Sequence, residues 1–156
     1  MKTANILVAA DFSKYSELLI KAAVKIGKGD ECKIHILHVE EDLFRIKQGH
    51  ALTCMDRELI PIIEGYHSSM MCECSKKMKE LMHKIPEDMR GESVILEGHA
   101  AESIINYVNE HKIDLLVIGS HGHTDLASML LGSTTDKVSR KANCSVFIVK
   151  DKSRNP

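Results

Sequence analysis

Short apolar runs alternate with segments of helical periodicity along the chain, and this alternation constrains the fold more than any other feature. The runs predict strands at Lys2–Ala10, Cys32–Glu40, Glu92–Gly98, Ile113–Gly119 and Cys144–Lys150. Strands that alternate with helices form parallel sheets covered by helices on both faces. The 156 residues suit one domain. We therefore expect a single-domain α/β fold with a five-stranded parallel sheet.

The segments between these runs carry apolar residues at the spacing of one helical face. They predict helices at Ser13–Gly27, Leu59–Leu81, Ala100–Lys112 and Ser133–Ala142. In the first helix we expect Ser13 to cap the start and Gly27 to end it in the left-handed conformation. Pro61 fits the first turn of the second helix, where a missing N–H costs nothing.

Charge and hydropathy exclude several classes of protein. The chain has 21 Lys and Arg against 22 Asp and Glu, so it lacks the basic excess that attracts nucleic acid. No apolar run approaches the ~20 residues that a membrane-spanning helix needs. The N-terminal run lacks a signal-peptide cleavage site. We expect a cytoplasmic protein that binds neither nucleic acid nor membranes.

The cysteines predict neither a disulfide framework nor a metal site. Five cysteines are an odd number, and without an export signal reduced thiols are expected. Cys72 and Cys74 lie near His67 and His83, which raises the question of a metal. Two residues apart on a helix, however, the two thiols point to different faces. We therefore expect no metal ligands among them.

The segment "GSHGHTDLASMLLGSTTDKV", which begins at Gly119, has the composition of a phosphate-binding loop. Gly119, Gly122 and Gly132 allow backbone amides to approach a ligand closely. Ser133–Asp136 predicts a helix start with a capping box, and helix N-termini attract anions. The spacing matches neither the Walker pattern nor GxGxxG. A simple turn followed by a helix cap explains the spacing equally well.

The predicted topology gives this segment a location. In open parallel sheets, ligands bind beyond the carboxyl ends of the strands, where the strand order reverses. Asp11 follows the first strand there, as a ribose or magnesium partner or as a helix cap. His38 lies near the end of the second strand, either beside this crevice or as a structural histidine. His121 and His123 have no partner base or nucleophile, so we expect no catalytic residue.

Four further segments match one family in order: "ILVAADFSKYS", "IHILHV", "GHAAESII" and "NCSVFIVK". With the G-x2-G-x9-G-S/T spacing of the glycine segment, the chain resembles the nucleotide-binding branch of the universal stress protein family. The resemblance implies a Rossmann-like sheet of order 3-2-1-4-5 and a homodimer through the last strand. The domain would span 1–150, and 151–156 would be a disordered tail.

The resemblance also implies a ligand: ATP or another adenine nucleotide, with Mg²⁺ held by its phosphates. Ala10 and Asp11 would lie near adenine and ribose, and the backbone of Val39 would contact adenine. The ribose and phosphates would be lined by Gly119, Gly122, His123, Gly132, Ser133 and Thr134. The function implied is a nucleotide-responsive stress module with an unknown protein partner. A slow ATPase, or an interaction protein with a vestigial site, remains an alternative.

Overall fold

The computed structural model describes residues 4–29, 31–41, 60–120 and 131–150. The strands are β1 (Ala4–Ala9), β2 (Cys32–Glu40), β3 (Arg90–Glu97), β4 (Leu115–Gly119) and β5 (Ser145–Val149). They form one five-stranded sheet of order β3-β2-β1-β4-β5. The pairings between neighbouring strands are parallel. The predicted fold class and strand order are confirmed.

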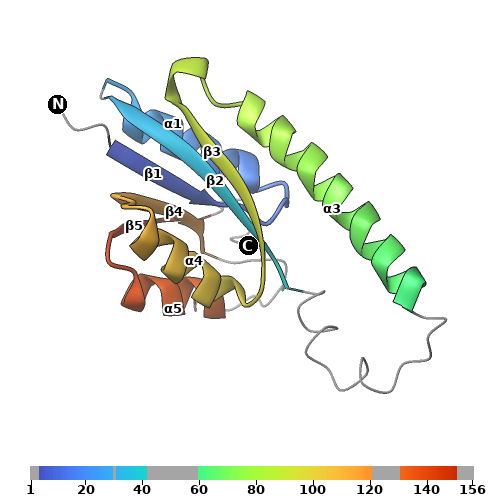
Figure 1. Cartoon of the computed structure of the whole chain (residues 1–156). Helices are drawn as coiled ribbons and strands as arrows, with labels where there is room; N and C mark the ends of the chain where they lie inside the picture. Colours follow the sequence, from blue (N-terminus) through green and yellow to red (C-terminus); the bar gives the residue numbers. More distant parts are fainter. Residues whose placement is uncertain (1–3, 30, 42–59, 121–130, 151–156) are drawn as a thin grey trace, which may run out of the picture.

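Helices cover both faces of this sheet (Figure 1). They are α1 (Ser16–Gly27), α3 (Ile60–His83), α4 (Ala100–Glu110) and α5 (Ser133–Lys141), with a short 3₁₀ turn, η2 (Glu87–Met89). Along β1 and β2, successive side chains enter opposite layers of the core because the strand period is two. Ile34 and Ile36 pack with residues of α1 and α3, whereas Leu37 packs with residues of α4 and α5. His38 therefore lies on the α1 and α3 side.

Both ends of α1 and the start of α5 differ from expectation. Helix α1 begins at Ser16 and ends at Gly27. Gly27 does not have a left-handed φ; that conformation occurs at Gly29 instead (φ 100°). A Cβ at Gly27 would collide with the Cys32 side chain, so close packing explains this glycine. The N-cap position of α5 is Gly132, not Ser133, so the residue there has no side chain to cap the helix, and Asp136 pairs instead with Arg140 at 3.0 Å. The predicted capping box is wrong.

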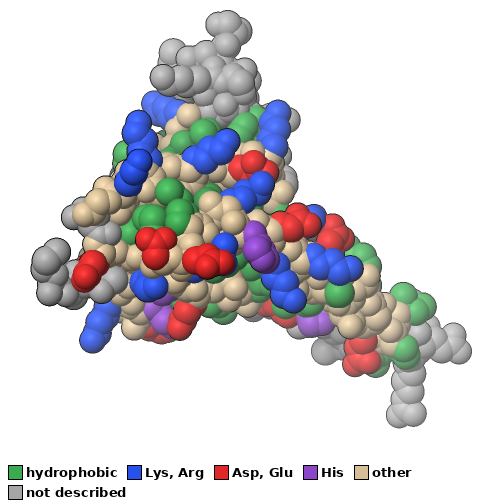
Figure 2. Space-filling model, turned by 90° about the horizontal axis from the view of Figure 1, so that it is seen from above, with side chains coloured by type: hydrophobic (Ala, Val, Ile, Leu, Met, Phe, Trp, Pro, Cys, Tyr) green, Lys and Arg blue, Asp and Glu red, His purple; other side chains and the backbone are tan. Residues whose placement is uncertain are grey.

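The face of the molecule seen in Figure 2 carries basic and acidic side chains interspersed, without a large region of one sign. This distribution agrees with the formal net charge of −1. In the same view and in Figure 1, the first turns of α3 extend beyond the sheet and the other helices. Ile62 and Tyr66 are 65% and 60% exposed there. No helix in the described part of the chain is long and apolar enough to cross a membrane.

Candidate nucleotide site

A cavity of about 820 Å³ opens at the carboxyl ends of β1, β2 and β4. The first turn of α5 and the middle of α3 complete its walls. Seven of the nine predicted site residues line it: Ala10, Asp11, Val39, Gly119, Gly132, Ser133 and Thr134. The other two, Gly122 and His123, lie outside the described residues, as does His121. The cavity thus lies where the topology placed the crevice.

The N-terminus of α5 is fixed against the end of β4 by two hydrogen bonds. The Thr135 hydroxyl, which is buried, donates to the Gly119 carbonyl at 2.7 Å. The Gly132 N–H donates to the Ser120 carbonyl at 2.9 Å. The Gly132 amide is therefore occupied, contrary to its expected role as a phosphate donor. The next three amides, of Ser133, Thr134 and Thr135, belong to the first turn of the helix and lack intrahelical acceptors, whereas the Asp136 N–H donates to the Gly132 carbonyl at 2.9 Å.

Helix α4 also begins at this cavity, since Ala100 lines it. Its first amide is already paired with a carboxylate of the protein, because the Ala100 N–H donates to Glu41 Oε1 at 2.7 Å. The N-cap residue of α5 is Gly132, which has no side chain, and among the described residues no carboxylate is seen to accept a hydrogen bond from the first turn of α5. A helix N-terminus carries about half a positive charge and free N–H donors, so it stabilises an anion. Since a carboxylate already occupies the start of α4, the start of α5 is the better candidate for an anion site.

Asp11 has a local structural role in addition to its place at the cavity. Its Oδ1 accepts hydrogen bonds from the Ser13 N–H at 3.0 Å and from the Ser16 hydroxyl at 3.3 Å. These bonds hold the turn between β1 and α1. Asp11 was expected either to bind ribose or magnesium or to cap the first helix. The structure shows a role similar to the cap, just before the start of α1. The role in ribose or magnesium binding stays a prediction.

Phe12 follows Asp11 with φ 58°, a left-handed conformation that costs a bulky residue about 1–2 kcal/mol. This backbone places the Phe12 ring on the His38 imidazole, with ring centroids 4.0 Å apart. Such outliers persist where the surrounding structure demands them, and they cluster at functional sites. Nothing in the sequence around Phe12 signals the conformation.

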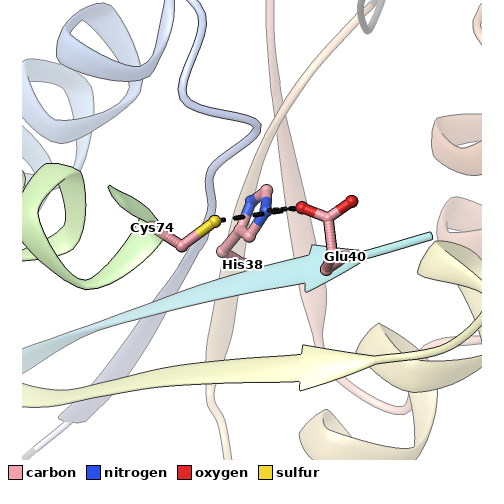
Figure 3. Close-up of side chains that lie close together, drawn as sticks. All are labelled: His38, Glu40 and Cys74. Carbon is pink, nitrogen blue, oxygen red and sulfur yellow. Dashed lines mark hydrogen bonds and ion pairs between the residues drawn. The ribbon is translucent and has the colours of Figure 1, made fainter. Parts of the chain in front are cut away.

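His38 lies on the wall of the cavity opposite α5 and is 7% exposed. Its Nδ1 lies 2.8 Å from the Ala10 carbonyl, so Nδ1 carries the proton and donates. Its Nε2 faces Glu40 Oε2 at 3.4 Å, and the Cys74 thiol lies 3.9 Å from the same carboxylate oxygen (Figure 3). The sequence pattern placed His38 near this crevice but did not predict its contact with Glu40 or that Cys74 reaches them, because Glu40 and Cys74 are 34 residues apart.

Burial affects the protonation of Cys74. Loss of solvation, followed by the negative charge of Glu40, raises the pKa of the Cys74 thiol above its ordinary value. Cys72, two residues earlier, is exposed. The predicted divergence of the two thiols is confirmed. At neutral pH, Cys74 is therefore a protonated thiol inside the cavity wall.

Comparisons with known proteins agree with this fold. Residues 63–150 match the model of the Universal stress protein family. The universal stress protein YxiE of Bacillus subtilis is 30% identical over 147 residues, covering 94% of this chain and 98% of YxiE. The solved structure of MJ0577 of Methanocaldococcus jannaschii has a TM-score of 0.79 at 24% identity, covering 97% of this chain and 99% of that one.

Two more distant structures share the fold and were solved with nucleotides. A universal stress protein from Archaeoglobus fulgidus in complex with dAMP has a TM-score of 0.64 at 18% identity. It covers 96% of this chain and 100% of that one. A universal stress protein in complex with cAMP has a TM-score of 0.62 at 20% identity, covering 96% and 98%.

Proposed function

The chain belongs to the universal stress protein family, and from that premise we propose that its cavity binds an adenine nucleotide, with ATP as the expected ligand. The adenine and ribose lie against Ala10, Asp11 and Val39. The phosphates lie at the first turn of α5, with Mg²⁺ held by the phosphates. The bound nucleotide then acts as a signal, by favouring one conformation or one partner complex.

The observation that carries this proposal is the N-terminus of α5. Hydrogen bonds from Thr135 and Gly132 fix it at the cavity, and its N-cap residue, Gly132, has no side chain that could occupy the amides of the first turn. Ser133 adds an exposed hydroxyl beside the amides of the first turn of α5. The cavity is also large enough for a nucleotide, because small-molecule sites span about 300–1,000 Å³. The dAMP and cAMP complexes of two relatives support adenine as the base.

The proposal is tested by calorimetric titration of nucleotide-free protein with ATP, ADP and AMP, with and without Mg²⁺. The informative variant is Ser133→Asp. A carboxylate in the first turn suits the helix dipole, so the fold is kept, but it repels phosphate. We expect ATP affinity to fall at least about tenfold, or about 1.4 kcal/mol.

Ser139→Asp is the matched control, because it makes the same charge change on the same helix at an exposed position. We expect it to bind ATP like the wild type. The proposal is overturned if wild-type protein binds none of the three nucleotides. It is also overturned if Ser133→Asp and Ser139→Asp bind ATP equally well.

We also propose that two copies of the chain associate through β5, within the cytoplasm. This strand is an edge of the sheet, and an edge presents unpaired backbone groups to a partner. Phe147 on this strand is 45% exposed, which gives the edge an apolar side chain. Sedimentation of the purified chain, which distinguishes a dimer from a monomer, tests the association.

A further inference from the structure

Three atoms of the metal-binding type meet on the wall of the cavity opposite α5: His38 Nε2, Glu40 Oε2 and Cys74 Sγ (Figure 3). They come from the end of β2 and from the middle of α3. All three lie within 4.8 Å of one another. His38 and Cys74 are buried, and Glu40 is half-buried. This group of atoms is called the β2–α3 cluster below.

The orientation of the His38 ring prepares Nε2 to be a ligand. Because Nδ1 donates to the Ala10 carbonyl, the neutral ring has its lone pair on Nε2, directed toward the Glu40 carboxylate. A lone pair that faces a carboxylate oxygen at 3.4 Å is repulsive unless a proton or a cation lies between them. Metal-binding histidines usually donate their other N–H to a backbone carbonyl or a carboxylate. Ala10 provides that carbonyl, and the Phe12 ring holds the imidazole from one side.

The spacing of the cluster suits tetrahedral coordination. With bonds of about 2.0 Å to nitrogen and oxygen and about 2.3 Å to sulfur, a tetrahedral ion separates N and O by about 3.3 Å and O and S by about 3.5 Å. The corresponding distances here are 3.4 Å for His38 to Glu40 and 3.9 Å for Glu40 to Cys74. The third distance, between His38 Nε2 and Cys74 Sγ, is at most 4.8 Å, against about 3.5 Å around such an ion, so the Cys74 side chain moves toward His38 on binding.

We propose that the β2–α3 cluster binds one divalent transition-metal ion of the zinc class. Mixed nitrogen, oxygen and sulfur ligands select Zn²⁺ over Mg²⁺ and Ca²⁺, which prefer oxygen alone. The fourth coordination position faces the cavity, where water or an oxygen of a cavity ligand completes the tetrahedron. On binding, the ion replaces the Cys74 thiol proton, which leaves to solvent, and a thiolate–metal bond forms. The inference does not depend on the proposed nucleotide.

The test uses full-length protein stripped with a chelator and titrated with ZnCl₂ without nucleotide, against a competing chromophoric chelator. The variants are Cys74→Ser and the control Cys72→Ser, which removes an exposed thiol two residues away on the same helix. We expect one Zn²⁺ per chain in the wild type and in Cys72→Ser. In Cys74→Ser we expect at least a tenfold weaker affinity. Glu40→Gln, which keeps the shape of the side chain, weakens binding as well.

A second measurement reports the sulfur ligand directly and does not depend on stability. Co²⁺ replaces Zn²⁺ in such sites, and a cobalt–thiolate bond gives an intense near-ultraviolet absorption band. We expect this band in the wild type and in Cys72→Ser, and its absence in Cys74→Ser. The inference is overturned if the wild type binds no Zn²⁺, or if the two serine variants bind alike. A hydrogen-bonded Cys74–Glu40–His38 chain without a cation is then the correct description.

Discussion

The two walls of the cavity are built differently. The wall formed by β4 and α5, called here the amide wall, includes Gly119, Ser133 and Thr134, and hydrogen bonds fix the helix start. On the opposite wall, three side chains meet in the β2–α3 cluster. Backbone amides recognise anions by position, whereas the cluster offers ligands for a cation. The comparison teaches that one cavity presents two chemistries on two different walls.

The largest expected effect on stability comes from Thr135→Val, which breaks the amide wall. The substitution keeps the shape of the side chain but removes the hydroxyl that donates to the Gly119 carbonyl at 2.7 Å. Because Thr135 is buried, the loss costs about 1–3 kcal/mol of the free energy of unfolding. Nucleotide affinity falls with it, since the start of α5 is no longer fixed. Urea unfolding and ATP titration measure the two effects.

Ser139→Ala is the control for Thr135→Val. The Ser139 hydroxyl donates to the Asp136 carbonyl at 2.9 Å, but on the exposed side of the same helix. We expect a change within about 0.5 kcal/mol. If Thr135→Val leaves Zn²⁺ affinity unchanged, the amide wall and the β2–α3 cluster act independently. If Thr135→Val loses both ATP and Zn²⁺ binding, the two walls depend on each other and the comparison fails.

Cys74 provides a test of the β2–α3 cluster through pH. Burial and the Glu40 charge raise the pKa of the Cys74 thiol, so little thiolate is present at neutral pH. We expect iodoacetamide to alkylate exposed Cys72 first, with Cys74 about tenfold or more slower. The rate at Cys74 rises as pH increases toward its raised pKa. Peptide mass spectrometry at several pH values measures both rates, and equal rates at pH 7 would contradict the buried thiol.

A smaller effect on stability is expected from His35, which lies on the face of β2 opposite to His38. Burial lowers the pKa of His35 below its ordinary value, so the native state keeps this ring neutral. Its Nδ1 accepts the Glu92 N–H at 3.1 Å, and its Nε2 is buried without a partner. A lowered pKa stabilises the fold above the unfolded-state pKa of about 6.5, and this contribution is lost as pH falls below it. We expect the free energy of unfolding to decrease between pH 7 and pH 5.

His35→Gln removes the titration and keeps an acceptor for the Glu92 amide, so its stability depends less on pH in that range. Denaturant unfolding at pH 7, 6 and 5 provides the comparison with wild type. If the wild type and His35→Gln lose stability in parallel, the acid sensitivity comes from other groups. The inference that the native state keeps His35 neutral would then be wrong.

Much of the fold follows from local pattern. Apolar runs and helical periodicity predicted every strand and α-helix that the structure describes, with β2 at its observed bounds, because burial on both faces leaves a clear signature. The short η2 turn was not predicted. The ends of α1 and α5 were less predictable. Gly27 is required by the packing of Cys32 rather than by its own backbone, and Asp136 turns to Arg140 instead of closing a cap.

The two walls of the cavity also differ in how far the sequence predicts them. The amide wall was predictable because its glycines and hydroxyl residues are close in sequence, although the use of the Gly132 amide by Ser120 was not. The β2–α3 cluster was not predictable, since Cys74 reaches Glu40 only after α3 packs beside β2 and β3. Helical periodicity predicted that the Cys72 and Cys74 side chains point to different faces of α3, but not which residues Cys74 contacts. Contacts between distant segments depend on tertiary packing, which local pattern does not encode.

The most direct test of the two-wall account is a crossed titration. Ser133→Asp and Cys74→Ser are each titrated in separate samples with magnesium ATP and with ZnCl₂, beside wild-type protein. We predict that Ser133→Asp loses ATP and keeps Zn²⁺, whereas Cys74→Ser loses Zn²⁺ and keeps ATP. If either variant loses both ligands, or if either keeps the ligand assigned to its wall, the separation of the two chemistries is contradicted.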